Sequence, residues 1–276
     1  MLGWFRKNCV TLILVGIIIV GLGLIAYPSV ANWWNSYHQT RAVSSYASVV
    51  AEMSHEDYDS ILNEASDYNK RIAKSGVIWR LSDEELIEYN NQLTVTESGI
   101  MGYIDISKIH VQLPIYHGTD DAILQVAVGH ISGSSLPVGG ETSHCIISGH
   151  RGLPSAKLFT DIDKLVVGDT WTINVLDQTL TYEVDQIRVV LPSDLSDLQM
   201  ESGKDYCTLV TCTPYGINSH RLLVRGHRIP NAQGNARVTA DALQIEPIYV
   251  APFIAGPIIL ILIIVLIITT GKRNNK

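Results

Sequence analysis

The sequence is poor in cysteine, with four residues in 276: Cys9, Cys145, Cys207 and Cys212. Four cysteines do not make a disulfide framework for an exported domain of this size. Cys207 and Cys212 are five apart in a β-like run, so their side chains point to opposite faces, and no short-spaced Cys/His cluster accompanies them. We therefore expect no disulfide scaffold, no metal site and no cofactor.

Basic residues are also scarce. Of the 20 Lys and Arg residues, five flank the two apolar ends of the chain, and the remaining 15 face 27 Asp and Glu, which leaves a net charge of −12. Phosphate binding needs a basic surface. The composition therefore excludes nucleic acid as a partner.

Long apolar runs, by contrast, occupy both ends. Residues 9–27 and 248–270 contain no charged residue, and each approaches the roughly 20 residues that cross a bilayer core. Basic residues precede the first run and follow the second, so the positive-inside rule places both termini (1–8 and 271–276) in the cytoplasm and the region between the spans outside the cell. The sequence predicts a multi-pass protein of the cell membrane, held by lipid through two helices.

Each apolar end has an alternative interpretation. The first run could be a cleaved signal peptide and the second a sorting tail. However, Tyr27-Pro28 and Trp33-Trp34 resemble an interfacial aromatic belt more than a small-residue cleavage site, and the second run ends in a basic stop-transfer patch. Two transmembrane spans are the preferred interpretation.

Residues 28–98 have the spacing of helices. Ser54-x-x-Asp57 and Ser82-x-x-Glu85 are capping-box patterns, and apolar residues follow each at helical spacing. Between the two helices, Ser75-Gly76 breaks the pattern, which predicts a lid-like loop over residues 73–82 that exposes Trp79. The helical stripes are expected to pack on the domain that follows.

From Gly99 onward the apolar residues recur with period two. Seven or eight strands are expected, in or near residues 101–106, 109–116, 145–148, 170–176, 180–190, 206–211 and 221–228. Short helices are expected after Thr119-Asp120-Asp121 and within 153–165. Many short strands with few helices predict a closed or nearly closed barrel over 99–230. The polar residues 231–247 would tether it to the second span.

Three reactive side chains stand at the edges of predicted strands. Cys212 ends one run and precedes Thr213-Pro214, His150 follows another within Ser-Gly-His-Arg-Gly, and Arg221 opens a third. A thiolate nucleophile, an imidazole for acid–base work and a guanidinium for a developing oxyanion together suit acyl transfer.

Each of these residues has a competitor. Cys212 could be a small buried apolar residue, as most free cysteines are. His130 and His227 are also framed by glycine, whereas His144 precedes its predicted strand and the remaining histidines lie in helical segments or lack such a turn.

The arginine has rivals in its own strand. Arg225 shares the face of Arg221 about two pleats away, and Arg228 lies on the opposite face. Arg221 itself could form a surface ion pair with one of the many carboxylates.

The segments around these residues closely resemble the sortases. The resemblance rests on Ser148-Gly149-His150, on residues 208–215 (TLVTCTPY) and on residues 218–228 (NSHRLLVRGHR), and it covers about 41–230. The run at 135–140 and the second apolar end resemble class C, the pilin-polymerising sortases. The resemblance implies a mainly β fold: an eight-stranded sortase-type β-barrel with an N-terminal helical extension and a transmembrane helix at each end.

The resemblance also implies a reaction. Cys212 would attack the Thr carbonyl of an LPxTG-like signal, cut between Thr and Gly, and form a thioester; His150 would transfer protons, and Arg221 would donate hydrogen bonds to the oxyanion. Thr211 resembles the family residue beside the acyl group, although it could simply be a β-branched strand residue.

Class C sortases resolve the thioester with a pilin lysine. A housekeeping sortase that attaches proteins to peptidoglycan is the alternative within the family. A non-catalytic membrane scaffold for pilin assembly and a simple hydrolytic protease are the alternatives outside it.

The chain departs from its family at the lid. Class C sortases typically block their cleft with a loop that carries Asp-Pro and an aromatic residue, and this sequence has no Asp-Pro. Trp79 could cover Cys212, or it could pack between the two predicted helices. Without a carboxylate latch and a stiff proline, we expect the loop to close loosely.

Cys145 and Cys207 each lie five residues before a predicted catalytic residue. The resemblance implies that the two strands are neighbours in the barrel. Equal odd offsets would then place both thiols at a similar height, on the face opposite the catalytic groups. Two adjacent buried thiols are expected in preference to a disulfide, because bridging neighbouring strands strains the S–S dihedral angle.

Overall fold

The structure is a computed structural model that describes residues 2–96 and 98–231. The chain divides into two compact units, residues 1–34 with 240–276 and residues 35–239. The predicted second span (248–270), the tail (271–276) and the tether after residue 231 lie outside the described residues.

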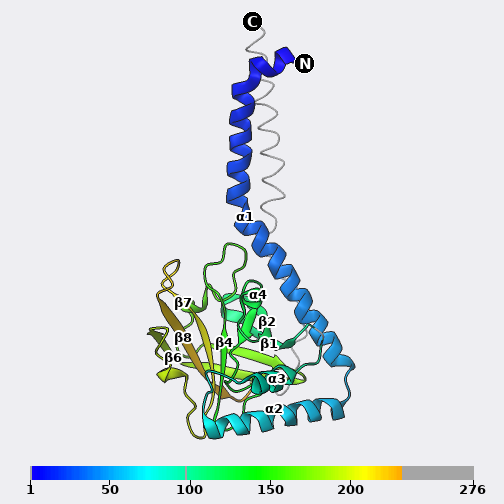
Figure 1. The fold of residues 1–276 in the computed structure, drawn as a ribbon, viewed down its shortest axis with the longest axis vertical. Coiled ribbons are helices and arrows are strands. Elements are labelled where there is room, and N and C mark those ends of the chain that lie inside the picture. Colours follow the sequence, from blue (N-terminus) through cyan, green and yellow to red (C-terminus); the bar gives the residue numbers. More distant parts are fainter. Residues whose placement is uncertain (1, 97, 232–276) are drawn as a thin grey trace. The chain divides into compact units, whose positions relative to one another are not determined.

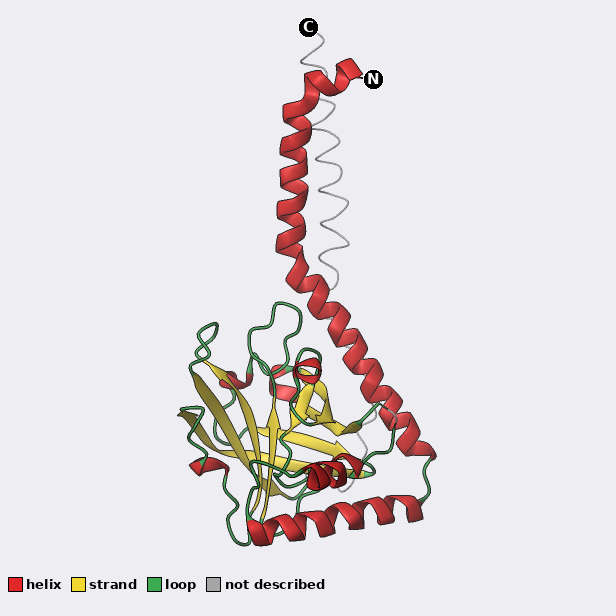
Figure 2. Ribbon diagram, in the orientation of Figure 1, coloured by secondary structure: helices red, strands yellow, loops and turns green. Residues whose placement is uncertain are grey.

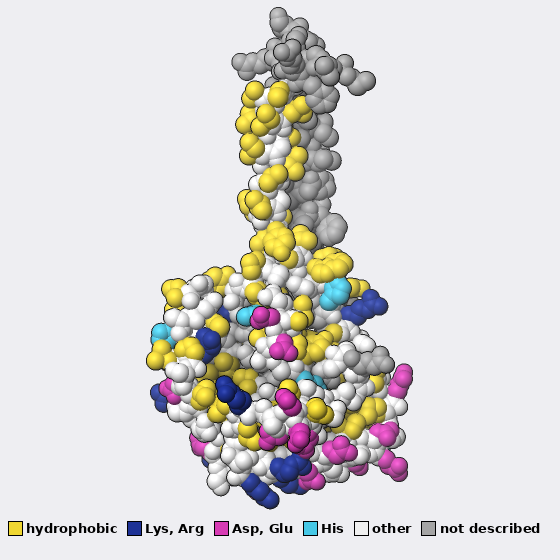
Figure 3. All heavy atoms as spheres, viewed as in Figure 1, with side chains coloured by type: hydrophobic (Ala, Val, Ile, Leu, Met, Phe, Trp, Pro, Cys, Tyr) yellow, Lys and Arg dark blue, Asp and Glu magenta, His cyan; other side chains and the backbone are white. Residues whose placement is uncertain are grey.

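The first described element is a single helix, α1 (Leu2–Glu52). In the N-terminal unit its side chains are apolar and exposed, as at Leu24 (71 %) and Ile25 (77 %), and the helix is long and apolar enough to span a membrane (Figure 3). The helix continues through Pro28, so no break in the helix marks the expected end of the span at residue 27, which stays a prediction. Proline removes only one backbone hydrogen bond, and the helix-forming sequence on both sides continues the ladder.

Residues 35–231 contain the predicted barrel, which is closed and has eight strands in the order β1-β2-β3-β4-β7-β8-β6-β5 (Figure 1). The strands are β1 (Ile100–Ile106), β2 (Val111–His117), β3 (Val128–His130), β4 (Ser143–Ser148), β5 (Thr170–Val175), β6 (Gln178–Val190), β7 (Asp205–Thr213) and β8 (His220–Ile229). β2–β3 and β4–β7 pair in parallel, and the other neighbours pair antiparallel.

Short elements account for the differences from the sequence prediction. β3 was not expected, because three residues are too few to show a period. β4 begins at Ser143, so His144 lies inside its strand, not before it. The short helix α4 (Asp121–Leu124) begins after Asp120 as predicted, but the segment 153–165 contains only the 3₁₀ turn η2 (Ile162–Lys164). Two further 3₁₀ turns, η1 (Ser107–Ile109) and η3 (Ser196–Leu198), follow β1 and β6.

The two predicted helices are present as α2 (His55–Ser75) and α3 (Asp83–Asn91). Each begins with the expected reciprocal capping box, at Ser54 and at Ser82. α2 lies across one end of the barrel (Figure 2). Buried Asn69 fixes it there, because its amide donates to the carbonyls of Leu136 (3.0 Å) and Gly139 (3.2 Å).

The residues of β7 alternate between the core and the outer face of the barrel. Cys207 and Leu209 belong to the main core, whereas Val210 joins a separate apolar cluster on the outer face. Cys145 of β4 is the register partner of Cys207, and both are buried and unbridged. The predicted adjacency of these two thiols, facing away from Cys212, is confirmed.

Candidate active site

Cys212, His150 and Arg221 come from three neighbouring strands at one end of the outer face. Cys212 in β7 is the register partner of Arg221 in β8. Ser148 in β4 is level with Val210 in β7, and the Gly149 N–H donates to the Val210 carbonyl (3.1 Å). β4 ends at Ser148, so His150 follows two residues beyond the strand, in the direction in which β7 leads to Cys212. All three residues are half-buried.

A hydrogen bond from Thr211 fixes the turn that carries His150. The Thr211 hydroxyl donates to the Gly149 carbonyl (2.7 Å), and Thr211 is only 2 % exposed. A Cβ at Gly149 would lie 2.7 Å from the Phe159 ring, so this approach requires glycine. The structure thus gives Thr211 a positioning role; its contact with an acyl group stays a prediction.

A second clasp joins the same turn to the end of β7. Arg151 donates to the Thr213 hydroxyl (3.3 Å) and forms an ion pair with Asp163. The sequence reasoning assigned no role to Arg151, although its place directly after His150 was the available signal. The clasp fixes the neighbours of both His150 and Cys212.

Arg221 differs from its two rivals in its partners. Its guanidinium donates to the carbonyls of Asn218 (3.3 Å) and His220 (3.2 Å), and within residues 2–96 and 98–231 it pairs with no carboxylate. Arg225 is instead paired with Asp185, and Arg228 donates to the Thr179 carbonyl. Arg221 therefore keeps donors available for a substrate.

Two other histidines are buried in hydrogen-bond networks. His130 is fully buried, with Nδ1 2.9 Å from the Tyr89 hydroxyl and Nε2 2.8 Å from the Ser135 carbonyl. Burial lowers the pKa of His130 to about 4, and burial also lowers the pKa of His144 to about 4. The third rival, His227, stands opposite Tyr206, at the other end of β7 from Cys212.

An apolar cluster lies next to Cys212 and Arg221 on the same face. Val210 and Leu223 are register partners, each two residues from Cys212 or Arg221, and they cluster with Ile146 and Leu198. Val77, which comes from the connection between α2 and α3, is buried in the same cluster. The sequence reasoning missed Val77, because a lone valine in a loop carries no local signal.

The predicted loop between α2 and α3 is present, but its boundary and its buried residue differ from expectation. Its role as a lid stays a prediction. α2 continues to Ser75 and ends at Gly76, whose positive φ (75°) favours glycine, so the loop covers residues 76–82. It docks through Val77 and through a bond from the Ile78 N–H to the Gly133 carbonyl (3.0 Å). Trp79 is 39 % exposed, and its covering of Cys212 stays a prediction.

In the described part of the chain, no group of three or more His, Cys, Asp or Glu side chains could hold a metal ion.

Comparison with known proteins decides the family. The family model of the Sortase domain matches residues 104–229. The chain is 56 % identical to the crystal structure of sortase C1 from Streptococcus agalactiae, over 69 % of this chain and 99 % of that one, with a TM-score of 0.68. The chain belongs to the sortase family.

Further relatives agree with this assignment. This sortase is 41 % identical to a structure of Clostridium perfringens sortase C with the C-terminal cell wall sorting motif, over 70 % of this chain and 100 % of that one (TM-score 0.62). It is 30 % identical over 131 residues to Sortase D of Bacillus subtilis strain 168, a match that covers 46 % of this chain and 63 % of that protein. Sortases are cysteine transpeptidases, and the similar structures are those of class C sortases.

Proposed function

We propose that this sortase is a membrane-anchored transpeptidase that uses Cys212, His150 and Arg221 to transfer an LPxTG-like sorting signal to an amine. The observation that carries the proposal is the register of β7 and β8, which pairs Cys212 with Arg221, while His150 follows the end of β4 on the Cys212 side of Val210. Residues 99–230 would be the catalytic barrel, and residues 9–27 and 248–270 would be its two membrane spans.

In the first half-reaction, the Cys212 thiolate attacks the Thr carbonyl carbon of the signal. Negative charge moves to the carbonyl oxygen, where the Arg221 guanidinium donates hydrogen bonds. The carbon–nitrogen bond to Gly then breaks, protonated His150 gives its proton to the leaving amine, and a thioester remains on Cys212.

In the second half-reaction, an incoming amine attacks the thioester carbon. His150 accepts the proton that the amine loses, the carbon–sulfur bond breaks, and Cys212 leaves as a thiolate. An amide links signal and acceptor, and the enzyme returns to its starting state.

The signal would lie over the apolar cluster in which Val77 is buried. An extended peptide bound at Cys212 and continuing along the same face would meet Val210, Leu223 and Ile146 next. An aliphatic side chain of the signal would replace Val77 there, because the cluster already holds an aliphatic group of similar size. Binding would therefore require the loop 76–82 to leave.

The acceptor is proposed to be a pilin lysine, which gives an isopeptide-linked polymer. The similarity to sortase C1 and to the sortase C structures supports this choice over attachment to peptidoglycan. A second membrane span would suit an enzyme that works at a fixed assembly site.

The test is to incubate the detergent-solubilised full chain with an LPxTG-type peptide, with and without an added amine. A transpeptidase gives an amine adduct that Cys212→Ala abolishes together with the thioester detected by mass spectrometry. Hydrolysis alone would indicate a protease, and no reaction would indicate a scaffold.

His150→Ala and Arg221→Ala should each slow the reaction by about 100-fold or more. A larger loss in His130→Ala or His227→Ala would overturn the assignment of His150.

A further inference from the structure

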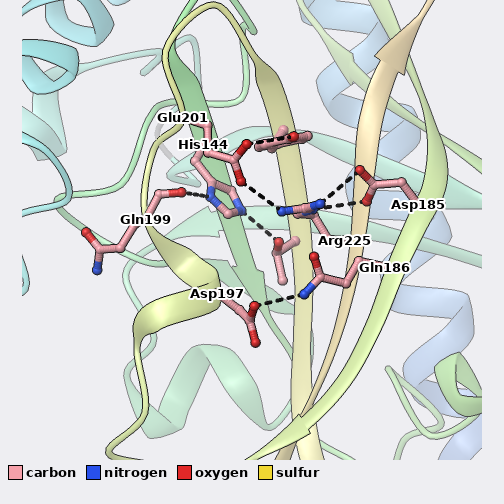
Figure 4. Close-up of polar contacts among 9 residues, drawn as sticks. His144, Asp185, Gln186, Asp197, Gln199, Glu201 and Arg225 are labelled. Carbon is pink, nitrogen blue, oxygen red and sulfur yellow. Dashed lines mark hydrogen bonds and ion pairs between the residues drawn. The ribbon is translucent and has the colours of Figure 1, made fainter.

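The connection from β6 to β7, residues 191–204, is tied to the barrel at alternate residues. Asp197 accepts a hydrogen bond from the Gln186 amide (2.8 Å). The Gln199 carbonyl lies 2.8 Å from Nδ1 of His144, and Glu201 accepts from Arg225 (3.3 Å). The three anchors on the barrel thus come from β6, β4 and β8 (Figure 4).

The residues between the anchors are part of the apolar cluster around Val77 or pack against it. Leu198 lies between Asp197 and Gln199, is 5 % exposed and belongs to the cluster around Val77. Met200 lies between Gln199 and Glu201 and packs against the same cluster. Each of the two apolar side chains is therefore held by a polar anchor on both sides.

The hydrogen bonds of His144 fit only one tautomer of its neutral ring. The Gln199 carbonyl can only accept, so Nδ1 carries the proton, and Nε2 then accepts from the Thr208 hydroxyl (2.7 Å). His144 and Thr208 are both fully buried. Burial, with Arg225 nearby, lowers the pKa of His144 to about 4, which keeps the ring neutral at pH 7. A neutral ring with both nitrogens satisfied fixes the Gln199 carbonyl.

Arg225 uses its planar fork in full. Nε and Nη2 donate to the two Asp185 carboxylate oxygens (3.0 and 3.1 Å), and Nη1 donates to Glu201. The guanidinium lies 4.2 Å from the centre of the Tyr206 ring, and the Tyr206 hydroxyl donates to the other Glu201 oxygen (3.2 Å). Lysine could not make this set of contacts, because it lacks the fork.

We propose that His144 and Arg225 are positioning residues that set the selectivity of this sortase for an aliphatic side chain of its substrate, by holding Leu198 and Met200 in place at the apolar cluster around Val77. Thr208 and Arg225 are register partners, separated from the Cys212–Arg221 pair by the Val210–Leu223 pair. The network therefore affects recognition of the substrate side chain and does not contact Cys212 or Arg221. This inference rests on the proposed function, because it names the substrate feature read at that same site.

The experiment compares full-length wild type, His144→Phe and Arg225→Met in detergent, with LPxTG-type peptides that carry Leu, Ala or Phe at the first position. Wild type should prefer Leu to Ala by about 10- to 100-fold in kcat/KM for thioester formation, the usual range for an apolar pocket. Both variants should reduce this preference by at least about 5-fold through KM, with kcat for the Leu peptide within about 3-fold of wild type. Arg225→Lys should recover only part of the preference.

Hydrogen exchange supplies a readout independent of activity. Amides at residues 196–201 should exchange faster in both variants than in wild type. Tyr46→Phe is the matched control, because the Tyr46 hydroxyl is likewise buried. It donates to the Met101 carbonyl (3.0 Å) and accepts from the Leu176 N–H (2.9 Å), and none of these residues belongs to the cluster around Val77. This control should lower the melting temperature yet keep the peptide preference and the protection of 196–201.

An unchanged preference, or a loss in kcat with KM unchanged, would overturn the inference. Should neither variant fold, Glu201→Ala removes one anchor at a half-exposed site and must still weaken the preference. If wild type forms no thioester with any peptide, the proposed function fails. In that case, unchanged exchange at 196–201 in the variants would also overturn the anchoring.

Discussion

At the scale of single residues, burial separates the cysteines and histidines of this chain into two groups. Cys212 and His150 stand half-buried on the outer face, whereas Cys145, Cys207, His130 and His144 are fully buried. Burial raises the pKa of the Cys145 thiol, which keeps it protonated and unreactive. The catalytic residue types are therefore present several times, and access to solvent distinguishes the copies.

The two buried histidines predict acid sensitivity. Their folded-state pKa values are about 4, against 6.5 for an exposed imidazole. Between these values the unfolded chain binds more protons, so stability should fall as the pH falls from about 6.5 to 4, by at most roughly 3 kcal/mol for each residue. The groups that face His130 are Tyr89 and His117, and those that face His144 are Arg225, Glu201, Asp185 and Tyr206.

Urea unfolding of the detergent-solubilised chain, followed by tryptophan fluorescence, measures this dependence. His130→Gln should be less stable at pH 7 and show a shallower loss between pH 6.5 and 4. Exposed His55→Gln is the control and should keep the wild-type slope. Equal slopes in all three proteins would contradict the prediction.

The core thiols predict a simple count. The unfolded, unreduced full chain should react with four equivalents of a thiol reagent, from Cys9, Cys145, Cys207 and Cys212. Cys145 and Cys207 pair in register on parallel neighbouring strands, where a bridge would be strained. A count of two would show that they are bridged.

At the scale of elements, the loop 76–82 is the segment that we expect to control access to Cys212. It is held by the burial of Val77 and by one backbone hydrogen bond to Gly133, and no carboxylate from it pairs with Arg221 among the described residues. Burying a valine contributes about 1.5–3 kcal/mol, which is a modest latch.

The rate at which Cys212 reacts with a small thiol reagent should report on this latch. Wild type should react readily, Val77→Asp about 10-fold faster or more, and Trp79→Ala only modestly faster, since Trp79 is already 39 % exposed. Slow labelling in wild type that jumps by orders of magnitude on deletion of residues 76–80 would reveal a tight lid instead. A larger effect of Trp79→Ala than of Val77→Asp would give the covering role to the ring.

At the scale of the whole molecule, the sequence predicts that the barrel lies outside the cell and that both termini lie in the cytoplasm. This follows from the apolar runs at 9–27 and 248–270 and from the basic residues that flank them. Within the described residues, one helix is apolar and long enough to span.

Single cysteines introduced into a chain whose native cysteines are changed to Ser test this arrangement. In intact cells an impermeant maleimide should label Asp120→Cys, on the barrel, but label Gly3→Cys and Asn275→Cys only after permeabilisation. Labelling of Asn275→Cys without permeabilisation would place the C-terminus outside and remove the second span.

The sequence by itself determined what depends on neighbours along the chain. The capping boxes at Ser54 and Ser82, the period-two runs of the long strands and the chemistry of Cys212, His150 and Arg221 are local patterns, and a local pattern is legible without the fold. The fixed side-chain alternation of a strand also predicted that Cys207 would face away from Cys212. The adjacency of Cys145 and Cys207 was predicted from the resemblance to sortases, which made their strands neighbours.

Only the tertiary structure decided what depends on segments distant in sequence. Val77 is buried because Ile146, Val210 and Leu223 from three strands meet beneath it, and His144 holds Gln199 because β4 carries it under the β6–β7 connection. Nothing in the residues next to Val77 or His144 indicates these contacts. A three-residue strand such as β3 is likewise too short to show a pattern in the sequence. It is defined by its pairing with β2 on one side and β4 on the other. Long-range packing, which a local pattern does not encode, decided these roles.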